Sequence, residues 1–354
     1  MPVEERARRG PLADIVVVDL TRALAGPHAA MMLADLGARV IKVERPGVGD
    51  DTRGWGPPFV VPESGAREST YFLSANRGKE SIALDLASDD GRETLAALVR
   101  RADVLLENFS TGVLDRLGFP PARLAELNPG LVLLSISGFG HDGPESGRAG
   151  YDQIAQGEAG LMSITGSSPD EPVKVGLPVA DLLAGMYGAY GVLAALVERS
   201  RTGLGQVVRT SLLSAVVGVH AYQGTRWTVA GEVPVAQGNH HISICPYGLF
   251  RCRDGAVQIS VGSELLWQRF STAFGIDGLG PGLASNAERV ANRERVIELV
   301  EAAFAAYDRE PLLARLAEVN VPAGKVRRID EVYEWEQTRS QGLLVEVEHE
   351  TLGP

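Results

Sequence analysis

The chain has very little cysteine, with only Cys245 and Cys252 among its 354 residues. Six residues separate these two cysteines, and no paired histidines accompany them. Structural zinc sites use CxxC spacings or cysteines combined with histidines, and neither pattern is present. The sequence therefore predicts two free thiols and no metal site.

An excess of positive charge is also missing, because 45 Asp and Glu residues outweigh 34 Lys and Arg and give a formal net charge of −11. An acidic protein offers no general basic surface to nucleic acid or to an anionic membrane. We therefore expect no nucleic-acid partner. A polyanionic ligand would need a local cluster of Arg, Lys and backbone amides.

Signals for targeting or for a membrane are lacking as well. The first ten residues are charged and contain no apolar core of the kind found in signal peptides. We expect no later stretch to be long and apolar enough to cross a bilayer. These absences predict a cytoplasmic protein without a membrane partner.

The first 140 residues alternate short apolar runs with helical patterns. Strands are predicted at 15–20, 39–44, 81–86, 102–106 and 131–136, and helices at 25–36 and 91–100. This alternation is typical of an α/β domain with a doubly wound parallel sheet. GxGxxG and the P-loop pattern are both missing, which argues against a nicotinamide dehydrogenase and a phosphate-hydrolysing enzyme.

In a doubly wound sheet, ligands bind outside the carboxyl ends of the strands. Four distinctive segments fall at those predicted ends and should surround one pocket. They are residues 21–27, 44–53, 107–112 and 137–144.

The composition changes in the second half of the chain and predicts a second domain. Helices are expected at 181–199 and 211–227, and the following stretch to residue 250 is rich in Gly, Pro, Asn and His. Asp254-Gly255 predicts a hairpin turn before a strand at 256–261, and 288–307 predicts an amphipathic helix. We predict a large domain at 1–225, a smaller α+β domain at 226–320, and a return segment at 321–354 that rejoins the large domain.

The segment from Val175 to Gly191 places Asp181 between an apolar extended run and a helix. Glycines at 185, 188 and 191 would let another backbone approach this helix closely, so the carboxylate would lie where two elements meet. Such a carboxylate could act as a covalent nucleophile. Asp is also a favoured helix N-cap, and this local pattern by itself favours capping over catalysis.

An ordered series of motifs resembles the family III CoA-transferases, which include formyl-CoA and carnitine CoA-transferases, with the α-methylacyl-CoA racemases as a close branch. The series covers nearly the whole chain. Its main members are residues 19–22, 25–27, 34–38, 40–46, 49–53, 76–79, 107–109, 138–140, 143–144, 194–196, 202–206 and 321–324.

This resemblance implies a Rossmann-like large domain built from both chain ends, a small domain between them, and two subunits interlocked as a homodimer. It also implies that Asp181 is the catalytic residue, which attacks an acyl-CoA thioester to form a mixed anhydride. The released thiolate would then form an aspartyl-CoA thioester, which the acceptor acid opens through a second anhydride. Acyl-CoA and a small carboxylic acid would be the substrates, with no permanently bound cofactor and no metal.

The resemblance further implies a coenzyme A site, and Arg and Lys suit its phosphate oxygens. The family pattern places Arg45, Lys79 and Arg116 at the adenosine and phosphate end, Arg22, Ala23, Ala25, Leu73, Asn108, Phe109 and Leu117 along the pocket, and Ser137 and Phe139 further in. For Lys79 taken alone, a solvated surface position is the favoured interpretation.

Tyr151 distinguishes the branches of this family. The racemases carry His before Asp at the position of Tyr151-Asp152, because racemisation needs a second base, and tyrosine is a poor base at neutral pH. The sequence therefore favours CoA transfer over an α-methylacyl-CoA racemase or epimerase, and a catalytically silent CoA-binding protein is the third alternative.

Three points stay open in the sequence. Asp152 either orients a partner or begins a turn or helix. His240 or His241 either contacts the acceptor or is an ordinary exposed loop residue. The identities of the donor and acceptor acids are not encoded in any motif.

Overall fold

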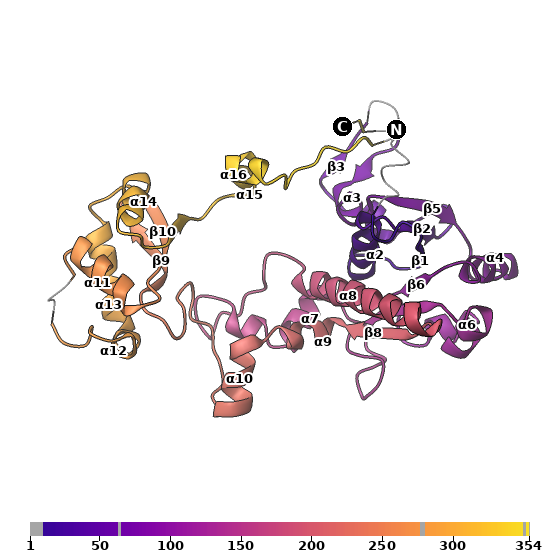
Figure 1. The fold of residues 1–354 in the computed structure, drawn as a ribbon, viewed down its shortest axis with the longest axis horizontal. Coiled ribbons are helices and arrows are strands. Elements are labelled where there is room, and N and C mark those ends of the chain that lie inside the picture. The colour runs from indigo at the N-terminus through magenta and orange to yellow at the C-terminus, as the bar shows by residue number, and fades with distance from the viewer. Residues whose placement is uncertain (1–9, 63–64, 277–279, 350–351, 354) are drawn as a thin grey trace. The chain divides into compact units, whose positions relative to one another are not determined.

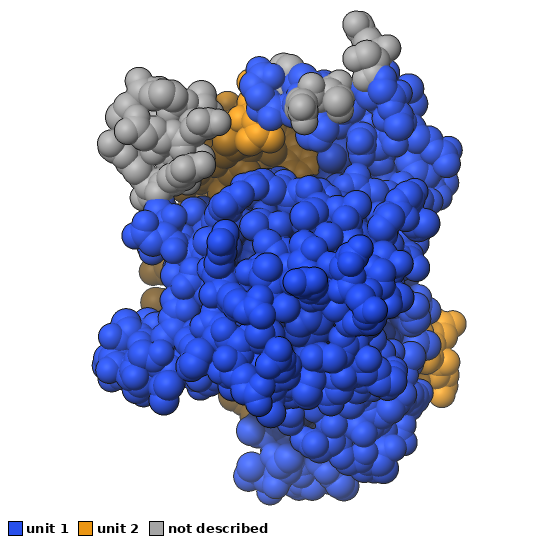
Figure 2. Space-filling model, turned by 90° about the vertical axis from the view of Figure 1, so that its right-hand side faces the viewer, with its two compact units in different colours: residues 1–163, 173–234, 348–354 blue, residues 164–172, 235–347 orange. Residues whose placement is uncertain are grey.

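The computed structural model describes residues 10–62, 65–276, 280–349 and 352–353. The charged segment at residues 1–9 lies outside them. The chain divides into a large unit of residues 1–163, 173–234 and 348–354 and a small unit of residues 164–172 and 235–347, coloured separately in Figure 2. These bounds differ from the predicted ones: the small unit begins nine residues later than expected, gains 164–172, and keeps 321–347 of the predicted return segment.

The large unit is organised around a six-stranded parallel sheet with the order β5-β2-β1-β6-β7-β8 (Figure 1). Its strands are β1 (Val16–Asp19), β2 (Arg39–Glu44), β5 (Lys79–Ala83), β6 (Val104–Glu107), β7 (Val132–Ser137) and β8 (Val207–Ser211). Val17 of β1 lies between Val40 of β2 and Val104 of β6. The predicted α/β class and parallel sheet are confirmed, since β-branched and apolar strands of this kind are stable only when both faces are covered.

Two apolar cores lie on opposite faces of this sheet, because successive side chains of a strand point in opposite directions. Along β6, Val104 and Leu106 belong to one core and Leu105 to the other. The first core contains α2 (Ala25–Asp35), α7 (Asp152–Glu158), α8 (Val179–Thr202) and α9 (Leu212–Gly218). The second contains α4 (Asp89–Val99), α5 (Val113–Arg116) and α6 (Pro121–Leu127).

The three glycines of α8 explain how this long helix packs. A Cβ at Gly185 would lie 2.6 Å from the carbonyl oxygen of Ala25 on α2. A Cβ at Gly188 would lie 2.9 Å from Leu134 on β7, and one at Gly191 2.5 Å from Val208 on β8. The predicted close approach of another backbone is confirmed at Gly185, whereas Gly188 and Gly191 make room for side chains of the sheet, and the first half of α8 packs against the start of α2.

By length and composition, α8 is long and apolar enough to cross a membrane, and it is the one such helix among the described residues. The expectation that no stretch would meet this criterion was wrong. One face of α8 packs in the core of the large unit, where the helix contacts α2, α9 and β7, whereas Met186, Tyr190 and Val197 are exposed.

Several elements were not expected from the sequence. Strand β8 is a partly exposed edge strand, so its apolar signal is weak. The predicted helix at 211–227 is two helices, α9 and α10 (Ala221–Ala230), because Ala221 has a left-handed backbone with φ +48°. A short hairpin of β3 (Phe59–Val60) and β4 (Glu68–Ser69) leads into α3 (Thr70–Asn76), and η1 (Asp51–Gly54) precedes it.

The small unit contains a three-stranded antiparallel sheet with the order β11-β10-β9. The sheet consists of β9 (Tyr247–Cys252), β10 (Gly255–Ser260) and β11 (Ala323–Lys325), and the unit's helices are α11 (Glu264–Ala273), α12 (Asn286–Ala291), α13 (Arg293–Phe304), α14 (Arg309–Glu318), α15 (Ile329–Glu334) and α16 (Glu336–Ser340). The predicted hairpin is confirmed, but its two-residue turn is Arg253-Asp254, one residue earlier than the expected Asp254-Gly255. Asn292 divides the predicted 288–307 helix into α12 and α13, and Cys245 and Cys252 are free thiols as expected.

Candidate active site

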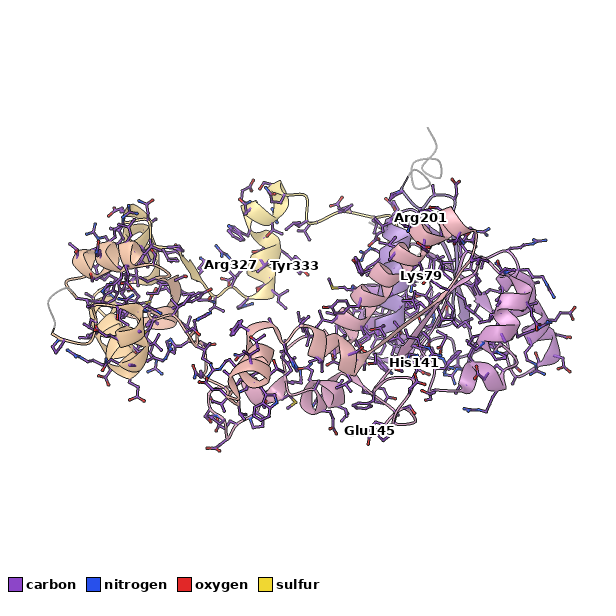
Figure 3. The ribbon with its side chains drawn as sticks, turned by 60° about the horizontal axis from the view of Figure 1, so that its bottom comes forward. Lys79, His141, Glu145, Arg201, Arg327 and Tyr333 are labelled. Carbon is purple, nitrogen blue, oxygen red and sulfur yellow. The ribbon has the colours of Figure 1, made fainter. Side chains whose placement is uncertain are left out.

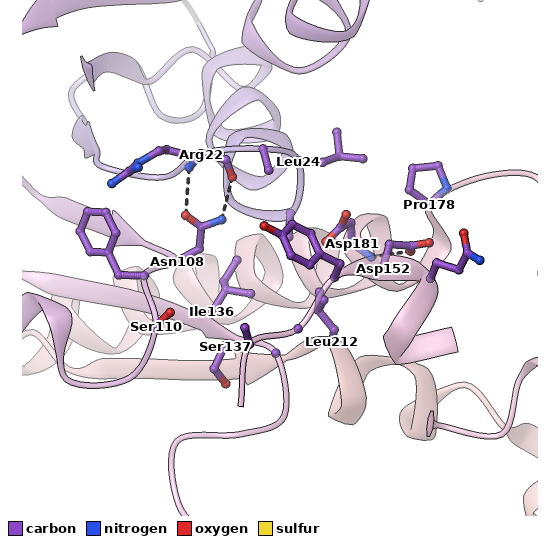
Figure 4. A pocket seen from close by; sticks show the side chains of 18 of the residues that line it. Arg22, Leu24, Asn108, Ser110, Ile136, Ser137, Asp152, Pro178, Asp181 and Leu212 are labelled. Atoms are coloured by element: carbon purple, nitrogen blue, oxygen red, sulfur yellow. Dashed lines mark hydrogen bonds between the residues drawn. The ribbon is translucent and has the colours of Figure 1, made fainter. Parts of the chain in front are cut away.

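A cavity of about 750 Å³ lies in the large unit beside the first turn of α8 (Figure 4). It is bordered by residues 22–25, 108–111, 136–138, 148–153 and 176–178, together with Asp51, Trp55, Tyr71, Val113, Ser146, Lys174, Asp181 and Leu212. All four segments predicted to surround one pocket contribute to it, although 44–53 does so only through Asp51. The carboxyl ends of β6 and β7 therefore lead into this cavity, as a doubly wound sheet requires.

Asp181 lines the cavity as the third residue of α8, because the helix begins at Val179. Pro178 is the N-cap residue and supplies no side-chain hydrogen bond. The expected extended run before Asp181 has no regular secondary structure. The capping interpretation of Asp181 was therefore wrong, and its carboxylate is not needed to begin the helix.

Asp152 performs that capping from another helix. Its Oδ1 accepts hydrogen bonds from the backbone N–H groups of Ala180 (2.8 Å) and Asp181 (3.3 Å). Its Oδ2 accepts one from Nε2 of Gln156 (2.7 Å). Of the two alternatives left open for Asp152, the helix-start role is thus present, since Asp152 also begins α7. The same contacts fix the backbone that carries Asp181.

The Asp181 carboxyl is difficult to ionise in this position. Burial, followed by the negative charge of Asp152, raises the pKa of Asp181 to about 7. No cation among the described residues forms an ion pair with it. Near neutral pH, Asp181 is therefore ionised in only part of the molecules, and its ionised form is a poorly solvated carboxylate that lines the cavity and can act as a nucleophile.

Tyr71 lines the same cavity, and burial, Asp181 and Asp152 together raise the pKa of its hydroxyl to about 12. The phenol therefore stays protonated at neutral pH and can donate a hydrogen bond into the cavity.

The loop between β1 and α2 forms the opposite side of the cavity. The Arg22 N–H donates to Oδ1 of Asn108 (2.9 Å), and Nδ2 of Asn108 donates to the Arg22 carbonyl (2.7 Å). The Arg22 guanidinium lies 5.4 Å from the centre of the Phe109 ring. Six residues of the implied coenzyme A site line this cavity together with Asp181: Arg22, Ala23, Ala25, Asn108, Phe109 and Ser137.

A second cavity of about 230 Å³ adjoins the same loop and shares Arg22 and Phe109 with the first. Arg45 and Leu117, two further residues of the implied coenzyme A site, line it. Asp51 forms ion pairs with Arg45 and, at 4.0 Å, with Arg22. Arg22, Phe109 and Val113 therefore border both cavities.

Four residues of the implied site line neither cavity. Leu73 is half-buried on α3, Arg116 is exposed on α5, and Phe139 is buried beneath the Arg148 guanidinium at 4.6 Å. Lys79 is buried within the large unit (Figure 3), so the surface interpretation of this residue was wrong. Its Nζ bonds to Oδ2 of Asp19 (3.0 Å), the Pro27 carbonyl (2.9 Å) and Oδ1 of Asn76 (2.9 Å), which uses all three of its donors.

The two histidines left open belong to the small unit and have packing partners there. The His240 ring lies 5.2 Å from that of Phe250, and His241 stacks on Tyr247 at 4.9 Å. Neither is fully exposed. No group of three or more His, Cys, Asp or Glu side chains within the described ranges could hold a metal ion.

Sequence reasoning missed Tyr71, Arg148 and Lys174 as cavity residues. Tyr71 reaches the cavity from α3 and Arg148 from a loop, and no local pattern marks either. Lys174 could have been found, because it immediately precedes the segment already singled out for Asp181.

Comparison with known proteins agrees with this geometry. The family model for CoA-transferase family III matches residues 12–354. The succinate–glutarate CoA-transferase of Agrobacterium fabrum is 40% identical over 97% of this chain and 86% of its own, and the human succinyl-CoA:glutarate CoA-transferase is 38% identical over 97% and 78%. A crystal structure of a CaiB/BaiF family protein from Brucella suis superposes with a TM-score of 0.85 and 42% identity, over 94% of this chain and 88% of that one. The chain therefore belongs to the family III CoA-transferases.

Proposed function

We propose that this enzyme transfers CoA between two small dicarboxylic acids and that Asp181 is its covalent nucleophile. The observation that carries the proposal is the unpaired, poorly solvated Asp181 carboxylate in a cavity shared with Arg22 and Asn108. The dicarboxylate class is supported by the two curated relatives, whose names specify succinate and glutarate.

The two cavities suggest how coenzyme A is held. The adenosine and phosphate end would occupy the smaller cavity beside Arg45, where guanidinium groups can bind phosphate oxygens. The pantetheine arm would then pass Arg22 and Phe109 into the larger cavity, which brings the thioester to Asp181. When a phosphate group binds to Arg45 and Arg22, it would replace Asp51 as the partner of these guanidinium groups.

The proposed reaction has four steps that conserve the thioester. Asp181 Oδ attacks the thioester carbonyl, the C–S bond breaks, and a mixed anhydride and CoA thiolate result. The thiolate attacks the Asp181 carbonyl and releases the donor acid, leaving an aspartyl-CoA thioester. The acceptor carboxylate displaces CoA to form a second anhydride, and the thiolate then attacks the acceptor carbonyl and frees Asp181.

Two features of the site would favour these steps. The Tyr71 hydroxyl is a protonated donor that could stabilise a tetrahedral oxyanion. The Asp152 cap fixes the first turn of α8, so Asp181 can return to the same position after each cycle.

We also propose a homodimer, because elements of both units carry apolar surface. Helix α10 has no buried residue, and its Trp227 and Val229 are 58% and 82% exposed. Helix α15 likewise has none, and Tyr333 projects from it (Figure 3). Apolar surface of this extent is typical of subunit interfaces. Light scattering during size-exclusion chromatography should give about twice the 37.7 kDa chain mass, whereas a monomer mass would refute the dimer.

Peptide mass spectrometry tests the covalent mechanism. The wild type would be incubated with succinyl-CoA, trapped with hydroxylamine or borohydride, and compared with Asp181→Asn. A modification confined to the peptide containing Asp181, and absent from the variant, supports the proposal. Transfer activity without any such modification, or an equal modification in the variant, would refute it.

A further inference from the structure

The main cavity has two ends with different chemistry (Figure 4). Arg22 and Asn108 lie at one end, and Asp152, Asp181 and Pro178 lie at the other. Lys174 lines the same cavity, and the backbone N–H of the next residue, Val175, is bonded to Gln156, which is bonded in turn to Asp152. The backbone at Lys174 therefore lies at the end of the cavity that holds Asp152 and Asp181.

Three cations line this cavity, and two of them already have acidic partners. Arg148 forms ion pairs with Glu158 and Glu145, and Arg22 lies 4.0 Å from Asp51. In the part of the chain that the structure describes, no carboxylate forms an ion pair with Lys174. Its one hydrogen bond, from Nζ to the Val175 carbonyl, is long at 3.4 Å.

The backbone next to Lys174 is held in place by a buried side chain. Oε1 of Gln156 accepts a hydrogen bond from the Val175 N–H (2.9 Å), and its Nε2 donates to the Leu177 carbonyl (3.3 Å). Gln156 is fully buried and bonds to Asp152, which in turn caps the helix of Asp181. One polar network thus links the backbone next to Lys174 to the first turn of the helix that carries Asp181.

We propose that Lys174 binds the distal carboxylate of a dicarboxylic acyl group while the reacting carbonyl lies at Asp181. This proposal rests on the proposed function. A dianionic acid entering an acidic protein must approach Asp51, Asp152 and Asp181, so it needs a cation without a partner of its own. An acid that ends in a methyl group cannot form an ion pair with that cation. The residue therefore determines specificity and does not take part in the bond changes.

Both half-reactions should depend on this contact. Donor and acceptor acyl groups react in turn with the same Asp181 carbonyl, so they use one acyl subsite. Lys174 should consequently favour succinyl-CoA over butyryl-CoA as donor, and glutarate over pentanoate as acceptor. Each pair differs mainly by a carboxylate in place of a methyl group.

The test compares Lys174→Met, Lys174→Arg and the wild type with these four substrates. We expect Lys174→Met to lower kcat/KM about tenfold for succinyl-CoA and for glutarate, mainly through KM, and to change it less than about twofold for butyryl-CoA and pentanoate. Lys174→Arg should keep most of the preference, because it retains the charge. Arg148→Met is the matched control: it removes a paired cation from the same cavity and should leave the ratio of succinyl-CoA to butyryl-CoA unchanged.

The outcomes separate this proposal from the proposed function. If the wild type and Lys174→Met both form the Asp181 adduct but keep the same preference for succinyl-CoA, the role of Lys174 is refuted and the mechanism stands. If Lys174→Met lowers kcat/KM equally for all four substrates, its effect is structural and the specificity claim fails. If no adduct forms in the wild type, the proposed mechanism itself fails.

Discussion

Two groups of buried carboxylates in the large unit have opposite surroundings. At the end of β1, Asp19 is matched by Lys79 (3.0 Å), and nearby Asp50 is matched by Lys42 (2.8 Å). At the start of α8, neither Asp152 nor Asp181 forms an ion pair with a cation of the described residues. Burial raises the pKa of an acid in both places, yet the two lysines outweigh it at Asp19 and hold that pKa below its usual value.

The difference indicates two roles: the paired carboxylates support the structure, and the unpaired ones are available for chemistry. In the matched group, Lys42 Nζ donates to the Thr21 carbonyl and Lys79 Nζ to that of Pro27, so the pairs hold both ends of the loop that carries Arg22 and Ala23. In the unmatched group, the Asp181 carboxylate forms no ion pair or hydrogen bond with any residue that the structure describes, and it stays available to a substrate carbonyl. The comparison predicts that changes to the matched group alter stability and changes to the unmatched group alter activity.

The largest expected effect is that of Asp181→Asn on CoA transfer. The amide occupies the same volume but cannot form an anhydride, so kcat should fall at least about a thousandfold, or about 4 kcal/mol in the activation free energy. Binding of CoA, measured by calorimetry, should change little. If the variant retained more than a tenth of the wild-type rate, the claim that the unmatched Asp181 is the nucleophile would be wrong.

Replacement of Lys42 by Met should be the most damaging change to the matched group. It leaves the buried Asp50 carboxylate without its cation, with only Oδ1 still bonded, chiefly by Thr52, which costs about 3 kcal/mol of unfolding free energy. Urea denaturation would measure the loss. Arg39→Met is the control on the same strand, because the exposed pair of Arg39 with Glu80 should contribute less than about 1 kcal/mol. Equal losses in the two variants would contradict the distinction between matched and surface charge.

Asp181→Asn should also stabilise the fold at high pH. The Asp181 carboxyl has a pKa of about 4 in the unfolded chain and about 7 in the folded protein, so the folded state binds this proton more tightly. The wild type therefore loses stability as the pH rises from about 4 to about 7, and the variant does not.

This gain should be on the order of 2 kcal/mol at pH 8 and absent at pH 4, as measured by urea denaturation at both values. The exposed Asp170→Asn serves as control and should show no such pH dependence. A gain of equal size at both pH values would show that Asp181 ionisation is not its cause.

The smallest expected effect belongs to Asp152→Asn. An amide oxygen can still accept the hydrogen bonds of Ala180 and Asp181, but the negative charge is lost, and so is the bond from Gln156 Nε2, which would face the new NH2 group. The pKa of Asp181 should fall by on the order of half a unit, because burial is its larger cause. The pH midpoint of activity should fall with it, while Asp152→Ala, which removes the cap, should also lower kcat.

Much of the fold followed from local pattern. Buried apolar strands such as Val104–Glu107 and Val132–Ser137 predict a parallel sheet, and the glycines of α8 predict close packing. Strand β8 escaped prediction because an exposed edge strand lacks a continuous apolar run. The break between α9 and α10 was not predicted for another reason. It is formed by Ala221 at positive φ, and no glycine or proline marks it in the sequence.

The site was predictable in part for similar reasons. Asp181 and the loop residues near it belong to motifs, so their presence at the cavity could be expected. The role of Asp152 could not, because a cap supplied by a side chain 28 residues earlier is a property of tertiary structure. The burial of Lys79 was missed because its partner Asp19 lies 60 residues away in the chain.

The pH dependence of kcat/KM for the acyl-CoA donor tests the central claim most directly, since it reports the ionisation of the free enzyme. With an unmatched, buried Asp181 as nucleophile, kcat/KM should rise tenfold per pH unit up to about pH 7 and remain level above it. A midpoint near pH 4 would show that Asp181 is solvated or paired like an ordinary carboxylate. That result would contradict the account, because the unmatched group would then have no special reactivity.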